Sequence, residues 1–583
     1  MFVKKIEISI NGKMMEVPNN YTVLEAAREI GVKIPTLCYL KGINEIGACR
    51  MCVVEIEGAR TLQASCVLPV KAGMKIETNS KRVRQSRKTT MELLLANHNR
   101  ECLMCNKSGY CELQKISEEL GIQEIRYEGV KREGIYDDIS PSIIRDSSKC
   151  ILCGRCVNVC KNVQGIGILD FVNRGFETVV APAFEFSLTD VPCISCGQCI
   201  IACPTGALTE KDNTDLVFEA IENDALHVVV QTAPAVRAAL GELFDYKIGT
   251  TVTGKMVASL RKLGFDKVFD TNFAADLTIM EEGTELIGRI NNGGKLPLIT
   301  SCSPGWVNYC ERFYPEFIEN TSSCKSPQQM FGSIVKSYYA EKENIDPKNI
   351  VVVSVMPCVA KKGESLREEM QNNGLRDVDI VITTRELGKM IKAAGIDFNS
   401  LEDEEPDKIL GEYSGAGVIF GASGGVMEAA LRTVSDIIEG KDLPKVDYKV
   451  VRGLEGIKEA NIEIGDLTVR AAIANGTKNA SILLERIKSG EKDYDFIEIM
   501  GCPGGCVNGG GQPYVSAEIK NNIDIITERA KVLYSEDEGL PLRKSHKNPE
   551  IVELYKDYLG EPNSHLAHEL LHTHYSKKEK YLK

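Results

Sequence analysis

The residues best suited to do chemistry in this 583-residue chain are its 21 cysteines. Fifteen of them precede residue 204, and the other six are spread over the rest of the sequence. Thiolates are soft ligands for iron and zinc, and in a reducing compartment so many cysteines bind metal rather than form disulfides. The sequence therefore predicts several metal sites in its first third and a separate centre beyond them.

Two of the later cysteines, Cys502 and Cys506, lie in a glycine-rich loop after the apolar run 496–500. Glycine lets the backbone approach a bulky group and adopt positive φ. The loop therefore predicts a large inorganic cofactor held at the end of a buried strand. The alternative is a glycine-rich turn that contains two incidental buried cysteines.

Residues 1–80 predict a small β-grasp-like module. Residues 5–10 and 13–17 flank Asn11-Gly12, which is a hairpin signal, and residues 22–30 form a capped helix. Four thiolates on this scaffold suit a [2Fe–2S] cluster, although a zinc site fits the same geometry. The stretch resembles plant-type ferredoxin domains. The four expected ligands are Cys38, Cys49, Cys52 and Cys66.

Residues 81–125 place one histidine and three cysteines after a helix expected at 81–96. A histidine at a helix end is usually solvated, but this one begins a cysteine-rich loop at ligand spacing. The stretch resembles a [4Fe–4S] module of [FeFe]-hydrogenases and of respiratory complex I. The resemblance implies four ligands, namely His98, Cys102, Cys105 and Cys111.

Residues 126–209 contain an internal repeat of four-cysteine runs that is specific for a two-cluster ferredoxin. In such pairs the fourth cysteine of each run binds the other cluster. The first predicted cluster therefore takes Cys150, Cys153, Cys156 and Cys203. The second takes Cys193, Cys196, Cys199 and Cys160. A zinc-binding repeat is the alternative. Together the predicted clusters form an electron wire that must lead to a redox centre.

The pattern changes from residue 210, where apolar runs alternate with helical segments, which predicts parallel α/β sheets. Strands are expected at 227–231, 267–270, 296–300, 349–355, 379–383, 418–420 and 496–500, and helices at 274–291 and 385–393. Ligands of such sheets bind beyond the carboxyl ends of strands. Four cysteines follow strand ends, namely Cys302, Cys358, Cys502 and Cys506. We expect these ends to converge on one cofactor between two lobes.

Three motifs at these ends look like the signatures of [FeFe]-hydrogenases, and the N-terminal cysteines are similar to the clostridial, monomeric type. The motifs are Thr300-Ser301-Cys302-Ser303-Pro304-Gly305-Trp306, Met356-Pro357-Cys358-Val359-Ala360-Lys361-Lys362-Gly363-Glu364 and Glu498-Ile499-Met500-Gly501-Cys502-Pro503-Gly504-Gly505-Cys506. The resemblance implies an H-cluster, which is a [4Fe–4S] cube joined to a diiron subsite with CO, CN⁻ and azadithiolate ligands. It implies Cys506 as the bridging thiolate, and Cys358 and Cys502 as further cube ligands.

The resemblance also implies roles around the diiron subsite. Lys361 would donate to a cyanide, and Met356 and Met500 would form apolar walls. Other cavity-lining positions would be Pro234, Ala235, Gln328, Phe420 and Gly421. Ala235 stands where the family often has serine, so one hydrogen bond to cyanide would be absent.

A proton route is implied as well. Glu282, Glu285 and Arg289 share one helical face, which on an anonymous helix is a solvated charged face. In the family, the matching positions together with Ser322 and Cys302 carry protons from solvent. A partly buried carboxylate there has its pKa raised toward neutrality, which suits proton transfer.

One position departs from the family pattern, because Ser303 stands where the commonest first motif has the cysteine that binds the cube. There are three interpretations. Ser303 binds the cube as an alkoxide, or Cys302 is the ligand, or Cys310 or Cys324 compensates for the absent cysteine. We favour Cys302 near the diiron subsite. For Cys310 and Cys324 we expect ordinary buried cysteines.

The segment from about residue 514 resembles the C-terminal part that wraps the catalytic domain. Its histidines His565, His568 and His572 recur at helical spacing, which could suggest a metal site. We interpret them as surface or packing histidines.

Composition limits the remaining choices. Apolar residues make up 43% of the chain, and the net charge is −12, which argues against nucleic acid and anionic membranes as partners. No long apolar segment or signal peptide is evident, so we expect a cytoplasmic protein. The expected domains are 1–80, 81–125, 126–209 and 210–583 in a multidomain α+β and α/β fold.

The expected function is reversible proton reduction to H₂, with ferredoxin or a similar carrier as electron partner and maturation proteins that supply the diiron subsite. The expected cofactors are the H-cluster, three accessory [4Fe–4S] clusters and one [2Fe–2S] cluster. The alternative is the catalytic subunit of an NAD(P)H-linked electron-bifurcating complex with flavoprotein partners. A non-catalytic iron–sulfur assembly protein is a third possibility.

Overall fold

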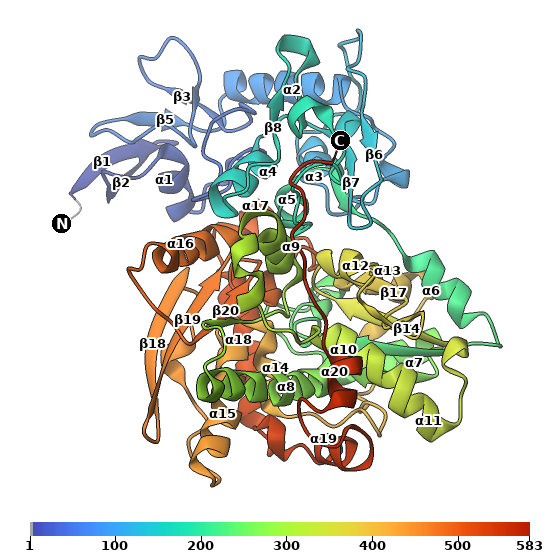
Figure 1. The fold of residues 1–583 in the computed structure, drawn as a ribbon. Coiled ribbons are helices and arrows are strands. Elements are labelled where there is room, and N and C mark those ends of the chain that lie inside the picture. Colours follow the sequence, from blue (N-terminus) through green and yellow to red (C-terminus); the bar gives the residue numbers. More distant parts are fainter. Residues whose placement is uncertain (1–3, 583) are drawn as a thin grey trace.

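The computed structural model describes residues 4–582, and its first module is a five-stranded sheet that packs on one helix (Figure 1). The strand order is β2-β1-β5-β3-β4. The elements are β1 (Lys5–Ile10), β2 (Lys13–Pro18), α1 (Val23–Glu29), β3 (Val53–Ile56), β4 (Gln63–Ala64) and β5 (Lys75–Glu77). Asn11 and Gly12 have φ of 50° and 79°, and Thr22 forms a capping box with Glu25. The predicted hairpin and capped helix are confirmed.

The second module consists of α2 (Lys81–Ala96), the cysteine-rich loop and α3 (Glu112–Glu119). Helix α2 has the predicted bounds, and Ser80 caps it by accepting a hydrogen bond from Val83 N. Arg87 on the buried side of α2 donates to Val53 O at 2.8 Å. This contact attaches the second module to the sheet of the first.

The two-cluster module repeats one local structure. Cys153-Gly154 precedes α4 (Arg155–Asn158), and Cys196-Gly197 precedes α5 (Gln198–Ala202). Both glycines have positive φ, 78° and 69°, which lets the chain turn sharply between a cysteine and its helix. The strands of the module are β6 (Tyr136–Asp137), β7 (Ile143–Asp146), β8 (Asp170–Val172), β9 (Val179–Ala181) and β10 (Leu208–Glu210).

The segment from residue 210 to about residue 513, expected from the sequence to be the catalytic part, contains two four-stranded sheets. The first has the order β12-β11-β14-β17 and is wholly parallel. Its strands are β11 (His227–Thr232), β12 (Lys267–Asp270), β14 (Ile350–Met356) and β17 (Ile380–Thr383). The second has the order β13-β20-β19-β18, with β13 (Leu298–Ile299), β18 (Ile457–Ile464), β19 (Leu467–Asn475) and β20 (Phe496–Met500). The expected α/β lobes are therefore present.

Two features of these sheets differ from the sequence prediction. The pair β18 and β19 is an antiparallel hairpin, so the second sheet is mixed. The strand expected at 418–420 is wrong, because α14 (Gly415–Val418) and a 3₁₀ turn (Ile419–Gly421) occupy it. Ser414 caps α14, and a Cβ on Gly417 would lie 2.6 Å from Asn272 O, so this helix packs tightly on α8 (Thr271–Asn292). Three apolar residues are too short a run to separate strand from helix.

Helices cover both sheets, and α8 (Thr271–Asn292) is the longest of those described. It begins three residues before its predicted start because Asp270 caps it by accepting from Asn272 N. The other helices of this part are α6 (Thr214–Ile221), α7 (Thr253–Leu263), α9 (Pro304–Phe313), α10 (Pro327–Ile334), α11 (Ala340–Glu343), α12 (Ala360–Glu364), α13 (Thr384–Ala393), α15 (Gly425–Glu439) and α16 (Thr477–Lys488). No helix within residues 4–582 is both long and apolar enough to cross a membrane.

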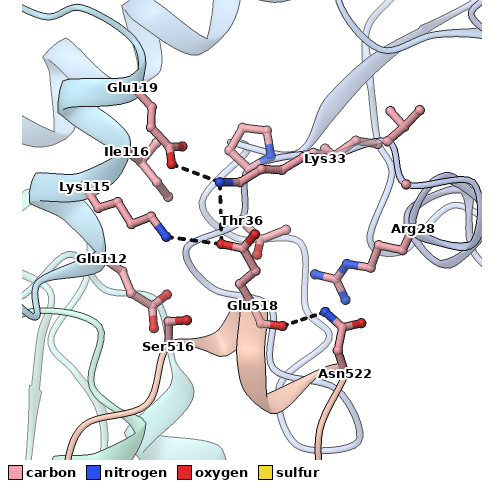
Figure 2. A pocket seen from close by; sticks show the side chains of 14 residues that line it. Arg28, Lys33, Thr36, Glu112, Lys115, Ile116, Glu119, Ser516, Glu518 and Asn522 are labelled. Carbon is pink, nitrogen blue, oxygen red and sulfur yellow. Dashed lines mark hydrogen bonds and ion pairs between the residues drawn. The ribbon is translucent and has the colours of Figure 1, made fainter. Parts of the chain in front are cut away.

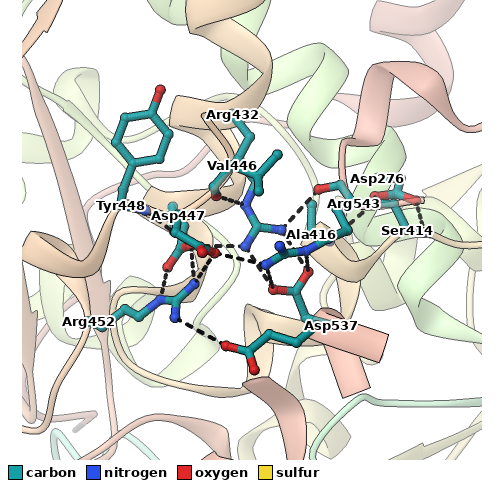
Figure 3. A network of polar contacts seen from close by, with 12 residues as sticks. Asp276, Ser414, Ala416, Arg432, Val446, Asp447, Tyr448, Arg452, Asp537 and Arg543 are labelled. Carbon is teal, nitrogen blue, oxygen red and sulfur yellow. Dashed lines mark hydrogen bonds and ion pairs between the residues drawn. The ribbon is translucent and has the colours of Figure 1, made fainter. Parts of the chain in front are cut away.

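The C-terminal segment wraps around the catalytic part and then runs up to the N-terminal modules (Figure 1). Its helices are α17 (Ala517–Lys520), α18 (Ile525–Gly539), α19 (Pro549–Leu554) and α20 (His565–Leu571). Figure 3 shows the charged network that attaches α18 to α15. Asp537 pairs there with buried Arg432 at 2.8 Å and with Arg543 at 2.6 Å. At the end of the chain, Leu582 N donates to Asp190 O.

Candidate active site

A cavity of about 90 Å³ lies where the carboxyl ends of β11, β13, β14 and β20 meet. The three motifs, which are far apart in sequence, all contribute to its wall. The predicted site residues that line it are Pro234, Cys302, Ser303, Gln328, Met356, Cys358, Lys361, Phe420, Gly421, Met500, Cys502 and Cys506. The expected convergence of strand ends on one crevice is therefore present.

The glycines of the third motif let its loop pack against the backbone around it. Gly504 and Gly505 have φ of 79° and 97°. A Cβ on Gly505 would lie 2.8 Å from Ser423 N, and one on Gly509 would lie 2.2 Å from Pro357 O. Side chains at these positions would push the loop away from the other two motifs, which explains why the sequence is glycine-rich here.

The second motif leaves β14 and turns into α12, which carries Lys361. The Lys361 ammonium is paired with Glu364 at 2.9 Å, and it donates to Ser326 Oγ at 2.7 Å and to Cys302 O at 3.2 Å. Sequence reasoning missed Ser326 and gave Glu364 no role, although Glu364 is three residues after Lys361 on one helix. These partners fix the cation at the wall of the cavity.

In the first motif, Ser303 and Cys302 have different surroundings. Ser303 precedes α9, and its Oγ accepts from Gly501 N at 3.0 Å, beside the third motif. Burial, followed by the charges of Glu282 and Cys506, raises the pKa of the Cys302 thiol well above its ordinary value. The structure thus places Ser303 toward the loop of Cys502 and Cys302 toward Glu282.

The remaining thiols of the cavity have raised pKa values too. Burial and then the charge of Cys358 raise the pKa of Cys506 to about 12, and the same two causes raise that of Cys502. Burial also raises the pKa of Cys358. Such thiols stay protonated unless a cation binds, and a coordinating metal deprotonates them. The donor set therefore fits an iron cluster that supplies the compensating positive charge.

The candidate proton route lies on α8. Burial and then the charge of Glu285 raise the pKa of Glu282 to about 8. Ser322 Oγ donates to Glu285 Oε2 at 2.8 Å, and Arg289 pairs with Glu285 Oε1 at 2.6 Å. The structure therefore brings the predicted residues together, with Glu282 innermost beside Cys302 and Arg289 outermost.

Some expected residues lie elsewhere. Ala235 is fully buried behind Gly421 and is not among the residues that line the cavity. Cys310 and Cys324 do not line it either: Cys310 Sγ donates to Tyr314 O, and Cys324 Sγ lies 4.0 Å from Glu285 Oε2. Their positions give no support for compensation of Ser303 by either cysteine. Nearby lining residues that were not expected are Ala233, Thr271, Ala275 and Pro327.

The accessory cysteines gather as the sequence predicted. Cys150, Cys153, Cys156 and Cys203 line one small cavity. Cys160 is the companion of the other run, since its charge contributes to raising the pKa values of Cys193, Cys196 and Cys199. In the first module Cys52 Sγ and Cys66 Sγ are 3.3 Å apart, and Cys38 N donates to Cys49 Sγ.

The histidine module presents an uncharged imidazole. His98 is buried, and burial lowers the pKa of its imidazole to about 4, so the ring is neutral and suited to bind a metal. Cys102 is exposed, whereas Cys105 and Cys111 are half-buried. A Cβ on Gly206 would lie 2.4 Å from Cys105 Sγ, which places this module against the two-cluster unit.

Short contacts connect the modules to one another and to the cavity. Asn44 Nδ2 donates to both Cys38 O and Cys153 O, at 2.7 and 3.0 Å, and so joins the first module to the two-cluster unit. At the other end, Cys502 Sγ lies 3.9 Å from Cys196 O. The first module and the histidine module therefore each contact the two-cluster unit, and the two-cluster unit contacts the wall of the cavity.

Comparison with known proteins agrees with this arrangement. Residues 226–510 match the iron only hydrogenase large subunit, C-terminal domain, and residues 523–578 match the iron hydrogenase small subunit. Residues 3–81 match a 2Fe-2S iron-sulfur cluster binding domain, 87–126 the NADH-ubiquinone oxidoreductase-G iron-sulfur binding region, and 149–207 a 4Fe-4S dicluster domain.

Similar proteins cover the whole chain. It is 52% identical to the NADP-reducing hydrogenase subunit HndD of Solidesulfovibrio fructosivorans, over 99% of both chains. It is 47% identical to iron hydrogenase 1 of Clostridium pasteurianum, over 98% of this chain and all of that one. A solved variant of the [FeFe]-hydrogenase HydA1 from Chlamydomonas reinhardtii matches 63% of this chain, with 43% identity and a TM-score of 0.57. The chain therefore belongs to the iron-only, or [FeFe]-, hydrogenase family.

Proposed function

We propose that this [FeFe]-hydrogenase interconverts protons and H₂, 2H⁺ + 2e⁻ ⇌ H₂, at the cavity where the three motifs meet. The observation that carries the proposal is the convergence of four thiols and a buried lysine on one cavity, with the accessory cysteines in contact at one side and a carboxylate relay at the other. Electrons and protons thus have separate routes to one place.

Cys358, Cys502 and Cys506 would hold the H-cluster, with Cys506 as the bridging thiolate. When bound, this group would supply redox-active iron with CO, CN⁻ and azadithiolate ligands, at which protons and electrons combine. The apolar side chains of Met356 and Met500 would exclude water from it. Lys361 is positioned by Glu364 and Ser326 so that its positive charge faces the cavity, where anionic ligands favour a cation.

Ser303 is the proposed fourth protein contact of the cube, and Cys302 the inner member of the proton route. The hydrogen bond from Gly501 N to Ser303 Oγ supports the first assignment, because the same backbone donor would stabilise an alkoxide. The charge of Glu282 at Cys302 supports the second. The protonated thiol of Cys302 can deliver a proton and take another from Glu282, so no net charge accumulates.

Protons would move between Glu285 and Cys302 through Ser322 and Glu282, and Arg289 would position Glu285 at the outer end of this route. With a pKa of about 8, Glu282 changes protonation state near neutral pH, which is the property a relay carboxylate needs. The hydroxyl of Ser322 can accept a proton on one side while it donates on the other.

Electrons would arrive through one [2Fe–2S] and three [4Fe–4S] clusters in the N-terminal modules, whose proposed extents are residues 1–80, 81–125 and 126–209. The last of them would be held by Cys193, Cys196, Cys199 and Cys160, and Cys196 O lies 3.9 Å from Cys502 Sγ. The proposed electron partner is ferredoxin or a similar small carrier, and the diiron subsite would come from maturation proteins.

Infrared spectroscopy of the matured protein under H₂ tests the proposal. Bound CO and CN⁻ give bands in a region without protein absorption, and we expect these bands to shift when H₂ replaces inert gas. A matured protein without such bands, and without H₂ evolution from a reduced carrier, would overturn the proposed function.

A second candidate role is the catalytic subunit of an NAD(P)H-linked bifurcating complex. The likeness to a chain named as a subunit of an NADP-reducing hydrogenase favours it, since it extends over the full length. The test is purification from the native host without tags. Co-purification of a flavoprotein, together with H₂ formation from NAD(P)H plus reduced ferredoxin, would favour this role over the single-chain enzyme.

A further inference from the structure

A second carboxylate on α8, Glu281, lies next to the proposed proton route but is not part of it. Glu281 is fully buried. Its Oε2 is 3.0 Å from His572 Nε2 and accepts from the backbone N of Asn563 at 2.8 Å, while its Oε1 accepts from the Tyr555 hydroxyl. All three partners come from the C-terminal segment. Burial of a carboxylate is costly unless hydrogen bonds compensate it, and these three partners hold Glu281 in one fixed orientation toward His572.

His572 continues this path toward the surface. Its side chain is 4% exposed, and its second nitrogen, Nδ1, is 2.8 Å from Ser323 Oγ. The ring of His568, which is exposed, lies 4.0 Å from the ring of His572 between centroids. The two histidines therefore lead from the buried carboxylate to solvent in two steps.

Cys324 lies between the proposed route and His572 of the tail. Its thiol lies 4.0 Å from Glu285 Oε2, and its backbone N donates to Ser322 Oγ. Burial, then the charges of Glu285, Glu282 and Glu281, raise the pKa of Cys324 well above its ordinary value. Cys324 is therefore a neutral S–H donor at the point where three carboxylates meet. A backbone bridge pairs Cys324 with His572.

Arg289 occupies one side of Glu285, whose side chain is 13% exposed. Its guanidinium pairs with Glu285 Oε1 and also donates to four backbone oxygens, those of Lys295, Glu319, Asn320 and Thr321. A guanidinium keeps its proton at every ordinary pH, so it cannot accept one in transit. The proton route at Glu285 thus meets a fixed cation on one side and Cys324 on the other.

We propose that Cys324, Glu281, His572 and His568 form a side route that carries protons between Glu285 and the solvent at the C-terminal segment. The inference rests on the proposed hydrogenase function and on the proposed relay through Glu282 and Glu285. It assigns a task to two of the three spaced histidines of the tail, which the expected chemistry left unused.

Each step moves one proton and leaves its carrier unchanged. During H₂ formation, neutral His568 takes a proton from water and passes it to His572, directly or through a water at the ring edges. His572 gives its proton to the Glu281 carboxylate. Glu281 then protonates the Cys324 sulfur as the thiol passes its own proton to Glu285. H₂ oxidation reverses the sequence, and no group keeps a net charge.

The charged groups around His568 influence the proton affinity of its ring. Glu281 and Glu285 on α8 favour the charged imidazolium of His568, whereas His572 and His565 of the tail disfavour it. Burial is the largest influence and lowers the pKa of His568, so this ring is neutral at pH 7 and free to accept a proton. Tyr555, Asn563 and Ser323 complete the surroundings as neutral hydrogen-bonding groups.

The test compares H568Q, H572Q and E281Q with H565Q in the matured full-length enzyme. His565 is a matched control, because it is an exposed histidine on α20 with no hydrogen bond to Glu281 among the described residues. H₂ evolution is measured from about pH 6 to pH 9 with saturating reduced carrier, with and without imidazole in the buffer. Thermal unfolding is followed for every variant.

We expect H568Q and H572Q to lose roughly tenfold in turnover at high pH and less at low pH, because proton collection limits the rate most where hydronium is scarce. Imidazole should restore H568Q, and H565Q, which removes only the smallest of the charge influences on His568, should stay close to the wild type at each pH. E281Q should lose turnover with the same pH dependence, because it removes the carboxylate to which His572 passes its proton.

Two results would overturn the side route. One is wild-type turnover in both H568Q and H572Q over the whole pH range. The other is a loss in H568Q that is equal at all pH values, is accompanied by a lower unfolding temperature and is not rescued by imidazole. If instead the wild-type enzyme itself forms no H₂, the proposed function fails rather than the side route.

Discussion

Ser303 and Cys302 are neighbours in sequence, yet their side chains face different chemistry. The oxygen of Ser303 is held by Gly501 N, whereas Cys302 lies beside Glu282. The backbone turn into α9, fixed by Pro304 at its first position, separates the two directions. Adjacent residues in such a turn can therefore divide cluster binding and proton transfer between them.

This division predicts the effect of substitutions at the two positions. We expect C302S to keep its iron content while turnover falls by a factor of ~10² to 10⁴, the usual contribution of one acid–base group. S303C should keep turnover and lower the reduction potential of the cube, because a thiolate is a softer and more electron-rich ligand than an alkoxide. Iron analysis measures the iron content, and electron paramagnetic resonance during a redox titration measures the reduction potential of the cube. C310A is the control. Loss of the cube in C302S would contradict the assignment.

The raised pKa of Glu282 predicts a titration near neutral pH. Below pH about 8 the native carboxyl is protonated, whereas in the unfolded chain it ionises near 4.5. Between these values the native state binds the extra proton, so this group makes the protein less stable as pH rises through that window. An infrared carboxylic-acid band should disappear with a midpoint near pH 8 and be absent in E282Q.

The second cause of the shift supplies a control for that titration. Since the charge of Glu285 also raises the pKa of Glu282, E285Q should retain the band and move its midpoint to lower pH. An unchanged midpoint in E285Q would mean that the two carboxylates do not interact.

At the scale of elements, two glycine-containing loops bring the electron path to the cavity. A Cβ on Gly510 would lie 2.5 Å from Cys196 O, and one on Gly197 would lie 2.9 Å from Gly510 Cα. The loop of the third motif and the start of α5 therefore touch backbone to backbone. This contact would set how closely the proposed last accessory cluster approaches the proposed catalytic one.

G510A is expected to separate these loops and slow electron delivery. H₂ evolution from a reduced carrier should fall about tenfold or more, while exchange of D₂ with solvent protons, which needs no external electrons, should persist. G539A is the matched control, because nothing lies within 4 Å of a Cβ there. Equal loss of both activities in G510A would indicate damage to the catalytic site instead.

The ion network between α15 and α18 predicts a large loss of stability in D537N. Asp537 and Arg432 are both fully buried, and D537N leaves Arg432 paired with one buried carboxylate, Glu428, in place of two, at a cost of up to about 3–5 kcal/mol. Burial opposes the ionisation of Asp537, but the hydrogen bonds from Arg432 and Arg543 leave it with a lowered pKa. Its contribution to the free energy of unfolding is therefore present above the ordinary pKa of 3.8 and is lost as the pH falls below it. E538Q is the control, since Glu538 is 60% exposed. Equal unfolding temperatures of the two variants would contradict this account.

At the scale of the whole molecule, the N-terminal modules meet the C-terminal segment around a cavity of about 250 Å³ (Figure 2). Lys33 of the first module is 2.9 Å from Glu119 of the second and 3.5 Å from Glu518 of α17. Lys115 is 3.2 Å from Glu518. These side chains are about a third to a half exposed, so each pair contributes only ~0–1 kcal/mol and is screened by salt.

This junction predicts a salt-sensitive attachment of the first module. Hydrogen exchange in α1 and α3 should increase a fewfold at about 1 M salt, where the screening length is ~3 Å, and by a similar amount in E518Q at low salt. E528Q is the control, because Glu528 pairs only within its own helix, with Lys531, among the described residues. Exchange that is independent of salt would show that buried contacts such as that of Asn44 hold the module alone.

Local sequence signals predicted the elements of this protein well. These signals depend on residues close in sequence, so they can be recognised without a structure. They are the cysteine spacing of 150–160 and 193–203, the cap at Thr22 and the uninterrupted apolar strands. The strand prediction at 418–420 was wrong because three apolar residues are too few to show a helical or strand periodicity. In the structure this segment is helical and packs against α8. The β18–β19 hairpin was missed although its signal is local, because Gly465-Asp466 joins two strands whose residues pair from Ile464 and Leu467 outward.

The sequence by itself determined the chemistry of this protein, because ligand type and spacing are local: cysteine runs for iron–sulfur clusters, and three motifs that place thiols at strand ends. Only the tertiary structure decided which side chains act on each other. Glu281 contacts His572, which is 291 residues away in the sequence, and Lys361 donates to Cys302 O, which is 59 residues away. Cys502 Sγ lies beside Cys196 O, which is 306 residues away. Such contacts depend on how helices and sheets pack, and packing is a property of the whole chain rather than of any motif within it.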